Sequence, residues 1–332
     1  MSLPPVEIPL GAMRFNSDSQ KLEYFNGEAW FQIHTFSPDL NGGSRGVYMG
    51  GYSWTDTIDY ITIPTAGDAT DFGNLIGNTY SLQTGTVASN VRGFTAGSAP
   101  NPGSDTIEYI TFSQTGNSTD FGNLQNGQYS HGACSNQTRG IWFGSYDTPA
   151  YIDVIDYITM ASAGNGVDFG NMLGATGFGY GGASPTRGIH AGGYPATNVI
   201  QYVTIASTGN AIDFGDISIG SMYGGGAVTS PTRFVFGGGH LHPAKTNKIE
   251  YITFATKGNS TEFGTLTQTR GYGLGGSSDC IRGVFSGGYT PTNVNTIDYV
   301  TIATEGDAVD FGDLTVARRG GAGSSNGHGG LG

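Results

Sequence analysis

Six copies of one phrase fill most of this 332-residue chain, and they limit its fold more than any other feature does. Each copy starts with Arg, runs through a short apolar stretch to a glycine pair or near equivalent, and continues to a phrase such as I-D-Y-I-T-I and then D-F-G or E-F-G. The copies open at six arginines that are 46 to 49 residues apart: Arg45, Arg92, Arg139, Arg187, Arg233 and Arg282. A period of about 40–50 residues that holds several short strands is typical of a β-propeller blade.

Each repeat reads as four short strands separated by turns. In the repeat that opens at Arg187, the segment V-I-Q-Y-V-T-I-A is rich in the β-branched and aromatic residues that favour strands. Gly209-Asn210 then marks a turn, and the glycine-rich segment 218–230 suits a strand near a crowded axis. Both alternating sets of side chains in the I-D-Y-I-T-I phrase are largely apolar, as in a sheet covered on both faces.

The end of the chain predicts how the ring of blades closes. After Leu314 the chain supplies one more Gly/Ala/Ser strand, whereas the first repeat at Arg45 lacks such a strand upstream. We expect this C-terminal strand to complete blade 1, which removes the free sheet edges. The sequence therefore predicts an all-β fold, with a small N-terminal β-meander in residues 1–40 and a six-bladed β-propeller in residues 41–332.

Charge and hydropathy exclude several classes of partner. Charged residues make up 12% of the chain and the net charge is −12, which argues against binding to nucleic acid or to an anionic membrane surface. No apolar run is long enough for a membrane-spanning helix, and the N-terminus lacks the pattern of a secretory signal. We expect no nucleic-acid partner and no membrane insertion.

The first forty residues read as a three-stranded meander, in which Asn26-Gly27 is a strong hairpin signal. So small a sheet cannot keep its many apolar side chains away from water by itself. It either caps the propeller or contacts another protein, and we favour the second alternative. The predicted attachment residues are Phe15, Tyr24, Trp30 and Phe31.

The recurring D-F-G phrase matches the magnesium-binding motif of protein kinases only superficially. The glycine-rich loop and the H-R-D loop that kinases require are both missing from the sequence. We expect Phe72 and its equivalents to pack between blades, with Gly73 and its equivalents in a bend. The repeated Arg and the acid before Tyr, such as Arg45 and Asp59, predict a buried or half-buried pair within each blade.

No set of residues predicts a metal, a cofactor or a catalytic centre. The turns of the type G-D-A-T-D lack the two or three carboxylates of a firm calcium site. His240 and His242 form an H-x-H pair, but zinc needs a third and usually a fourth ligand. A scaffold repeated without a unique acid–base cluster is a poor enzyme candidate, so we expect neither a cofactor nor catalysis.

The loops between the second and third strands vary most from repeat to repeat. In a propeller they emerge on one face, and variable loops on a rigid scaffold are where binding concentrates. Aromatic rings there offer flat apolar surfaces with polar neighbours, which suit sugars, although drift in loops without a function explains the same variation. The candidate ligand-binding residues are Trp54, Tyr146, Tyr151, Tyr194, His240, His242 and Tyr289.

The sequence motifs of the repeats resemble those of two protein families. The glycine pairs (Gly50-Gly51, Gly192-Gly193, Gly287-Gly288) and the later aromatic resemble the kelch repeat, with Phe-Gly where kelch proteins usually carry Trp. More closely, N-T-I-D-Y-V-T-I-A-T-E-G-D-A-V-D-F-G-D-L and the ending S-S-N-G-H-G-G-L resemble repeat proteins of tailed bacteriophages, especially marine ones. This likeness covers roughly residues 41–332. The opening segment G-A-M-R-F-N-S-D-S resembles a short module of phage tail-fibre and other virion proteins.

The resemblance implies a non-enzymatic structural protein of the phage particle, in the tail fibre or baseplate, assembled in the host cytoplasm. It implies other virion proteins as partners and a loop face that binds a glycan or protein of the host surface. Two alternatives stay open: a purely architectural capsid or neck decoration protein without a host ligand, and a glycan-cleaving enzyme. The sequence also leaves a homo-oligomer open.

Overall fold

The computed structural model describes residues 8–16, 21–32, 44–52, 55–79, 85–98, 104–147 and 149–331. Strands dominate these residues, and their one helix is a short 3-10 turn, η1 (Gly329–Leu331). The chain divides into two compact units, Met1–Asn41 and Gly42–Gly332. The predicted all-β fold is confirmed.

The first unit is a three-stranded antiparallel meander of β1 (Met13–Asn16), β2 (Lys21–Phe25) and β3 (Trp30–Gln32). The hairpin between β2 and β3 is closed by Asn26, whose Oδ1 accepts hydrogen bonds from the backbone N–H groups of Glu28 and Ala29. Gly27 follows it at φ +102°, a conformation that glycine adopts without strain.

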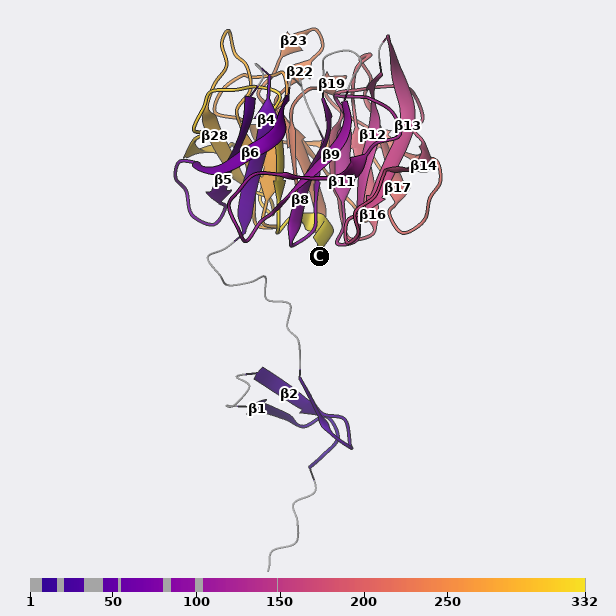
Figure 1. Cartoon of the computed structure of the whole chain (residues 1–332), viewed down its shortest axis with the longest axis vertical. Helices are drawn as coiled ribbons and strands as arrows, with labels where there is room; N and C mark the ends of the chain where they lie inside the picture. The colour runs from indigo at the N-terminus through magenta and orange to yellow at the C-terminus, as the bar shows by residue number, and fades with distance from the viewer. Residues whose placement is uncertain are drawn as a thin grey trace, which may run out of the picture. The chain divides into compact units, whose positions relative to one another are not determined.

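The second unit contains six four-stranded antiparallel sheets in a propeller-like arrangement (Figure 1). We number them 1 to 6 along the chain and give their strands in spatial order. Sheet 1 consists of β30 (Ala322–Ser325), β4 (Arg45–Gly51), β5 (Thr55–Thr62) and β6 (Thr70–Thr79). Sheet 2 consists of β7 (Thr86–Ala88), β8 (Arg92–Ser98), β9 (Ser104–Thr111) and β10 (Thr119–Asn123). Sheet 3 consists of β11 (Gly132–Ser135), β12 (Arg139–Asp147), β13 (Ala150–Thr159) and β14 (Val167–Asn171).

The other three sheets repeat this order. Sheet 4 consists of β15 (Tyr180–Ala183), β16 (Arg187–Ala191), β17 (Val199–Thr204) and β18 (Ile212–Asp216). Sheet 5 consists of β20 (Gly226–Thr229), β21 (Arg233–Gly237), β24 (Lys248–Thr253) and β25 (Thr261–Thr265). Sheet 6 consists of β26 (Gly275–Ser278), β27 (Arg282–Ser286), β28 (Thr296–Thr301) and β29 (Val309–Asp313). A small extra sheet contains β19 (Met222–Tyr223), β22 (His240–Leu241) and β23 (Ala244–Lys245).

Sheet 1 joins the two ends of this unit. Strand β30 pairs antiparallel with β4, in a register that runs from Ala322 opposite Met49 to Ser325 opposite Gly46. The predicted pairing of the C-terminal strand with the first repeat is therefore confirmed. We call the first strand of each sheet its inner strand; contacts between neighbouring inner strands link β7, β11, β15, β20, β26 and β30 in that order, and β30 also contacts β7.

Apolar side chains fill the spaces between neighbouring sheets. Val47, Ile58 and Phe72 of sheet 1, for example, pack in one cluster with Ala88 and Phe112 of sheet 2. All five are buried. Covering each sheet on both faces explains why both alternating sets of the I-D-Y-I-T-I phrase are apolar.

The D-F-G phrase fastens each sheet to the next. The Phe72 carbonyl accepts a hydrogen bond of 2.8 Å from Gly116 N in the adjacent sheet, and a Cβ built on Gly73 would lie 2.3 Å from the Gly116 carbonyl oxygen. The same bond recurs at 2.7 to 3.1 Å in the pairs Gly164–Phe121, Gly209–Phe169, Gly258–Phe214, Gly306–Phe263 and Gly67–Phe311. The last pair joins sheet 6 to sheet 1. We call these six contacts the latches.

The repeated arginines do not pair with the repeated acids, so that interpretation was wrong. Each guanidinium lies 4.7 to 5.2 Å from the ring centroid of the Tyr in its own sheet, beginning with Arg45 over Tyr60. Its Nη1 donates to a carbonyl at the end of a strand in the next sheet. The donor–acceptor pairs are Arg45–Phe112, Arg92–Met160, Arg139–Ile205, Arg187–Phe254, Arg233–Ile302 and Arg282–Ile63.

The repeated acids point to the opposite face of the sheet from the repeated arginines, and two of them pair with different arginines. Asp298 binds Arg270 at 2.9 Å and Asp59 binds Arg318 at 3.1 Å, with all four side chains buried. Each of these arginines lies in the segment that leads into an inner strand. Leu173 N donates to Gln201, which replaces the acid in sheet 4. A basic partner is not required at this position, because Glu108, Asp156 and Glu250 accept hydrogen bonds from neutral side chains in sheets 2, 3 and 5.

A glycine pair tests the latches. Gly215→Ala places a Cβ 2.3 Å from the Gly258 carbonyl oxygen, and this clash should lower the free energy of unfolding by about 1–3 kcal/mol. Gly209→Ala is the matched control, because its φ of +154° resembles the +156° of Gly215 but nothing lies within 4 Å of its Cβ. Urea denaturation of both variants measures the difference, and equal destabilisation would show that the close contact has no energetic role.

Candidate binding site

Two sets of turns meet at the same end of the six sheets, which we call the mouth. One set connects the second and third strands of each sheet, and the other leads into the inner strands. Backbone bridges join the two sets at Tyr129 with Tyr146, at Gly177 with Tyr194 and at Gly271 with Tyr289. Figure 1 shows the small sheet of β19, β22 and β23 at this end and the C-terminus at the opposite end.

Aromatic side chains form a continuous series around the mouth. Successive ring centroids are 4.5 to 5.7 Å apart. We call this series the aromatic arc, and in order it contains Tyr129, Tyr146, Tyr151, Tyr194, Tyr223, His240, Tyr272 and Tyr289. Its residues come from sheets 3 to 6, so a single ligand that lies along the arc would touch several repeats.

The structure brings most of the candidate binding residues together. Five of them, Tyr146, Tyr151, Tyr194, His240 and Tyr289, belong to the arc. His242 lies at its margin, with its ring 6.5 Å from that of Tyr223. Trp54 lies outside the described residues.

Sequence reasoning missed three members of the arc. Tyr129, Tyr223 and Tyr272 lie in the glycine-rich segments that lead into inner strands, which we had interpreted only as small-residue strands. The signal was an aromatic residue at nearly the same place in each segment, as in Q-Y-S-H-G, M-Y-G-G-G and G-Y-G-L-G. The small residues around it allow the backbone turns to approach one another closely.

The arc combines exposed rings with a buried centre. Tyr194 is 39% exposed and Tyr272 is 38% exposed. His240 is buried between them, stacked on Tyr223 with an interplanar angle of 10° and in edge contact with Tyr272. Its Nδ1 has no hydrogen-bond partner among the described residues.

Burial shifts the pKa of some groups of the arc toward the uncharged form. It raises the pKa of Tyr151 to about 12, with smaller contributions from nearby tyrosines, first Tyr194 and then Tyr146. Burial also lowers the pKa of His240, assisted by the positive charge of Lys245. At neutral pH Tyr151 and His240 therefore offer a neutral hydroxyl and a neutral imidazole, which can both donate and accept hydrogen bonds.

Two cations lie over the rings at one end of the arc. The Arg319 guanidinium lies 4.0 Å from the Tyr52 ring centroid and 4.4 Å from that of Tyr289. Lys245 Nζ lies 4.2 Å from the Tyr289 centroid and 5.5 Å from that of Tyr272. All four distances are within the range of cation–π attraction.

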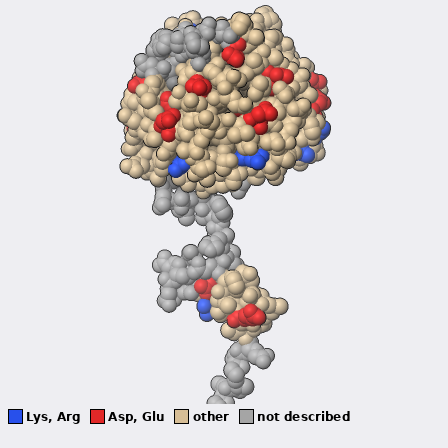
Figure 2. Space-filling view, turned by 45° about the vertical axis from the view of Figure 1, so that its right-hand side comes forward, with Lys and Arg blue, Asp and Glu red and all other residues tan. Residues whose placement is uncertain are grey.

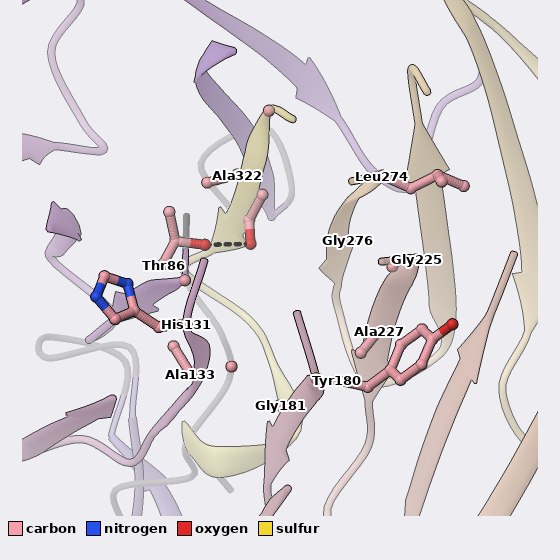
Figure 3. Close-up of a pocket in the computed structure, with 16 residues that line it drawn as sticks. Thr86, His131, Ala133, Tyr180, Gly181, Gly225, Ala227, Leu274, Gly276 and Ala322 are labelled. Atoms are coloured by element: carbon pink, nitrogen blue, oxygen red, sulfur yellow. Dashed lines mark hydrogen bonds between the residues drawn. The ribbon is translucent and has the colours of Figure 1, made fainter. Parts of the chain in front are cut away.

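The space between the inner strands is too small for a sugar. It contains two cavities of about 70 and 50 Å³, lined mostly by glycine, alanine and serine. Thr86 bridges neighbouring inner strands by donating to the Gly323 carbonyl (Figure 3). Because drug-sized ligands need pockets of roughly 300 Å³ or more, only water-sized molecules fit here.

The C-terminal segment covers the other end of this space. Strands β11, β15 and β20 contact η1. His328 Nε2 lies 2.9 Å from the Ala88 carbonyl oxygen, and Gly329 N donates to Thr229 Oγ1.

The predicted attachment residues fall on two faces of the meander. Pairing in register places Met13 opposite Tyr24 and Tyr24 opposite Phe31, so Phe15, Tyr24 and Phe31 share one face, and all three are exposed. Trp30 lies on the other face, where the Arg14 guanidinium covers its ring at 4.2 Å. The predicted group therefore consists of an exposed trio and a separate, half-buried Trp30.

No protein-family model and no curated protein matches this sequence. Among the described residues, no helix has the length and apolar character needed to cross a membrane. The same part of the chain holds no group of three or more His, Cys, Asp or Glu side chains that could bind a metal ion.

Buried histidines should make the fold sensitive to acid. His131 lines the larger cavity, and burial lowers its pKa to about 3. Because the unfolded chain takes up a proton near pH 6.5 and the folded chain does not, stability is lost as the pH falls below 6.5. We expect His131→Gln to reduce the loss of unfolding free energy between pH 7 and pH 5 by about 2 kcal/mol.

Urea titrations at the two pH values measure this effect. His242→Gln is the control, because it removes a histidine from an exposed loop. An unchanged pH dependence in His131→Gln would contradict the assignment.

Proposed function

We propose that the six sheets are the blades of a closed, kelch-like β-propeller. Three observations support closure: β30 pairs with β4, β30 contacts β7, and the latch of Gly67 with Phe311 joins the last sheet to the first. The repeats differ from the usual kelch motif at the position of the Phe-Gly pair, and this difference has a physical reason. Phe-Gly replaces the usual Trp because the glycine must approach a backbone carbonyl of the neighbouring blade, as at Gly73.

We infer that the mouth of this propeller is a carbohydrate-binding face on a non-enzymatic scaffold. The single observation that carries this conclusion is the aromatic arc. Its rings supply flat apolar surfaces, and its phenol hydroxyls and imidazole groups supply hydrogen bonds close by, which is the combination that a sugar ring needs. Exposed Tyr194 and Tyr272 are the residues that we expect to contribute most.

The arc favours an extended ligand over a small molecule. Its rings follow one another at 4.5 to 5.7 Å across four sheets, while the cavities between the inner strands stay below about 100 Å³. An oligosaccharide that lies across the mouth meets both conditions. The rigid blades hold the rings in place before binding, which reduces the entropy that the ligand contact must offset.

The biological setting is proposed from the resemblance to tailed-phage repeat proteins. In that setting the chain is a virion protein of the tail fibre or baseplate, and the mouth faces a host-surface glycan. The exposed trio of Phe15, Tyr24 and Phe31 offers an apolar face for contact with another virion protein.

A glycan array and a host-cell binding assay with the full chain test this function. Tyr194→Ala and Tyr272→Ala should each weaken binding by about tenfold or more, as for a central aromatic contact. Ile281→Ala is the control, because Ile281 is 67% exposed in the turn between β26 and β27, at the other end of β27 from Tyr289.

Three outcomes separate the alternatives. Binding that depends on the arc supports the proposal. Absence of binding to every glycan and every host cell contradicts it and favours a purely architectural role. Shortened polysaccharide after incubation with the chain would identify a glycan-cleaving enzyme.

A further inference from the structure

Arg319 differs from the other arginines of the described residues because its guanidinium makes no hydrogen bond to a protein group. Each of the others donates to a backbone carbonyl or to a carboxylate. Among the described residues, the Arg319 guanidinium lies over the rings of Tyr52, Tyr272 and Tyr289, and its Nε is buried without a hydrogen-bond partner. A buried donor on a charged group that lacks a partner is unfavourable, so the site is incomplete without a ligand or water.

The buried acids Asp59 and Asp298 already pair with other arginines. Arg318, next to Arg319, binds Asp59, and Arg270 in the corresponding segment of sheet 6 binds Asp298. The undescribed residues within 42–332 include no Asp or Glu in the sequence, so they cannot supply a carboxylate either. Arg318 therefore serves the scaffold, whereas Arg319 has no such role.

Lys245 adds a second positive charge to the same place. It donates one hydrogen bond, to the Thr290 carbonyl, and an ammonium group has three donors. It has no ion-pair partner among the described residues. Burial lowers the pKa of Lys245, and the charge of Arg319 lowers it further. The two cations thus repel each other, and an anion placed between them would relieve the repulsion.

We propose that Arg319 and Lys245 form a subsite for the anionic group of an acidic sugar, with Tyr272 and Tyr289 as the surface that supports its ring. The proposal rests on the carbohydrate-binding function inferred above and names the class of sugar. The planar guanidinium can hold two oxygens of a carboxylate, sulfate or phosphate, and Lys245 supplies a point charge beside it. The neighbouring neutral rings of the arc then bind the following, uncharged parts of the chain.

The rest of the surface makes this subsite selective. The chain carries a net charge of −12, and carboxylates are scattered over the flank of the six-sheet unit (Figure 2). Carboxylates on the flank therefore repel an acidic glycan there, and the cations of the subsite attract it. Binding of the acidic ligand should weaken as salt rises, because the contact is exposed to solvent.

Matched pairs of glycans with and without charge test the subsite. The probes are oligogalacturonate against its methyl ester, dextran sulfate against dextran, and a phosphorylated mannan against the dephosphorylated mannan, each titrated into the full chain by calorimetry. We expect at least one acidic member to bind at least tenfold more tightly than its neutral partner, and the pair that does so identifies the anion. Arg319→Gln and Lys245→Gln should each lower the affinity for the acidic member to about that for its neutral partner, so that the preference is lost.

Lys257→Gln is the control for lost charge. Lys257 is exposed, lies 4.9 Å from the Tyr202 ring and belongs to the turn between β24 and β25, away from the mouth. Its variant should keep the preference for acid, and equal melting temperatures of the three variants exclude a folding defect. Equal binding of both members of every pair overturns the anionic subsite and leaves the carbohydrate-binding function standing. Absence of binding to all probes and to the wider glycan array overturns both.

Discussion

The structure depends on one short contact between neighbouring sheets. In each latch an amide of one turn donates to the Phe carbonyl of the preceding D-F-G or E-F-G phrase, and the adjacent glycine lets the two backbones approach without a side chain between them. An isolated four-stranded sheet with two apolar faces has no stable place in water, so each sheet needs neighbours on both sides. The latches fix how those neighbours sit, and the arginine contacts at the strand ends repeat the same linkage from sheet to sheet.

The packing of the inner strands explains why the large aromatic and charged side chains of the candidate site lie at the mouth. The inner strands are built from small residues, and their close packing leaves cavities of only about 70 and 50 Å³. Larger side chains find room only where the turns spread apart. There, buried pairs such as Arg270 with Asp298 anchor the backbone, and the aromatic arc lies on turns next to them. The sheets hold these turns in place, so the rings form a preorganised surface. Such a surface is what the proposed binding of a glycan requires.

The sequence predicted the strands well and the side-chain partners poorly. The spacing of the repeats and the alternation of I-D-Y-I-T-I were enough for the four-stranded sheets and for the pairing of β30 with β4, because both follow from local patterns. The arginines were assigned to the wrong partners, since the register puts Arg45 on the same face of the sheet as Tyr60, whereas Asp59 points to the opposite face. Tyr129, Tyr223 and Tyr272 were missed because their contacts join residues of different repeats, which no local pattern reveals.

Every functional proposal above requires the sheets to close, because only then do the variable turns share one mouth. The most direct measurement is amide hydrogen exchange at the six glycines that donate in the latches, followed by NMR on the full chain. Gly67 joins the last sheet to the first, and its amide bond to Phe311 is 2.8 Å long, like that of Gly116 to Phe72. We predict that Gly67 exchanges as slowly as Gly116, Gly164, Gly209, Gly258 and Gly306, through cooperative opening of the whole unit. Exchange at Gly67 that is orders of magnitude faster than at the other five would show an open arrangement and contradict the account.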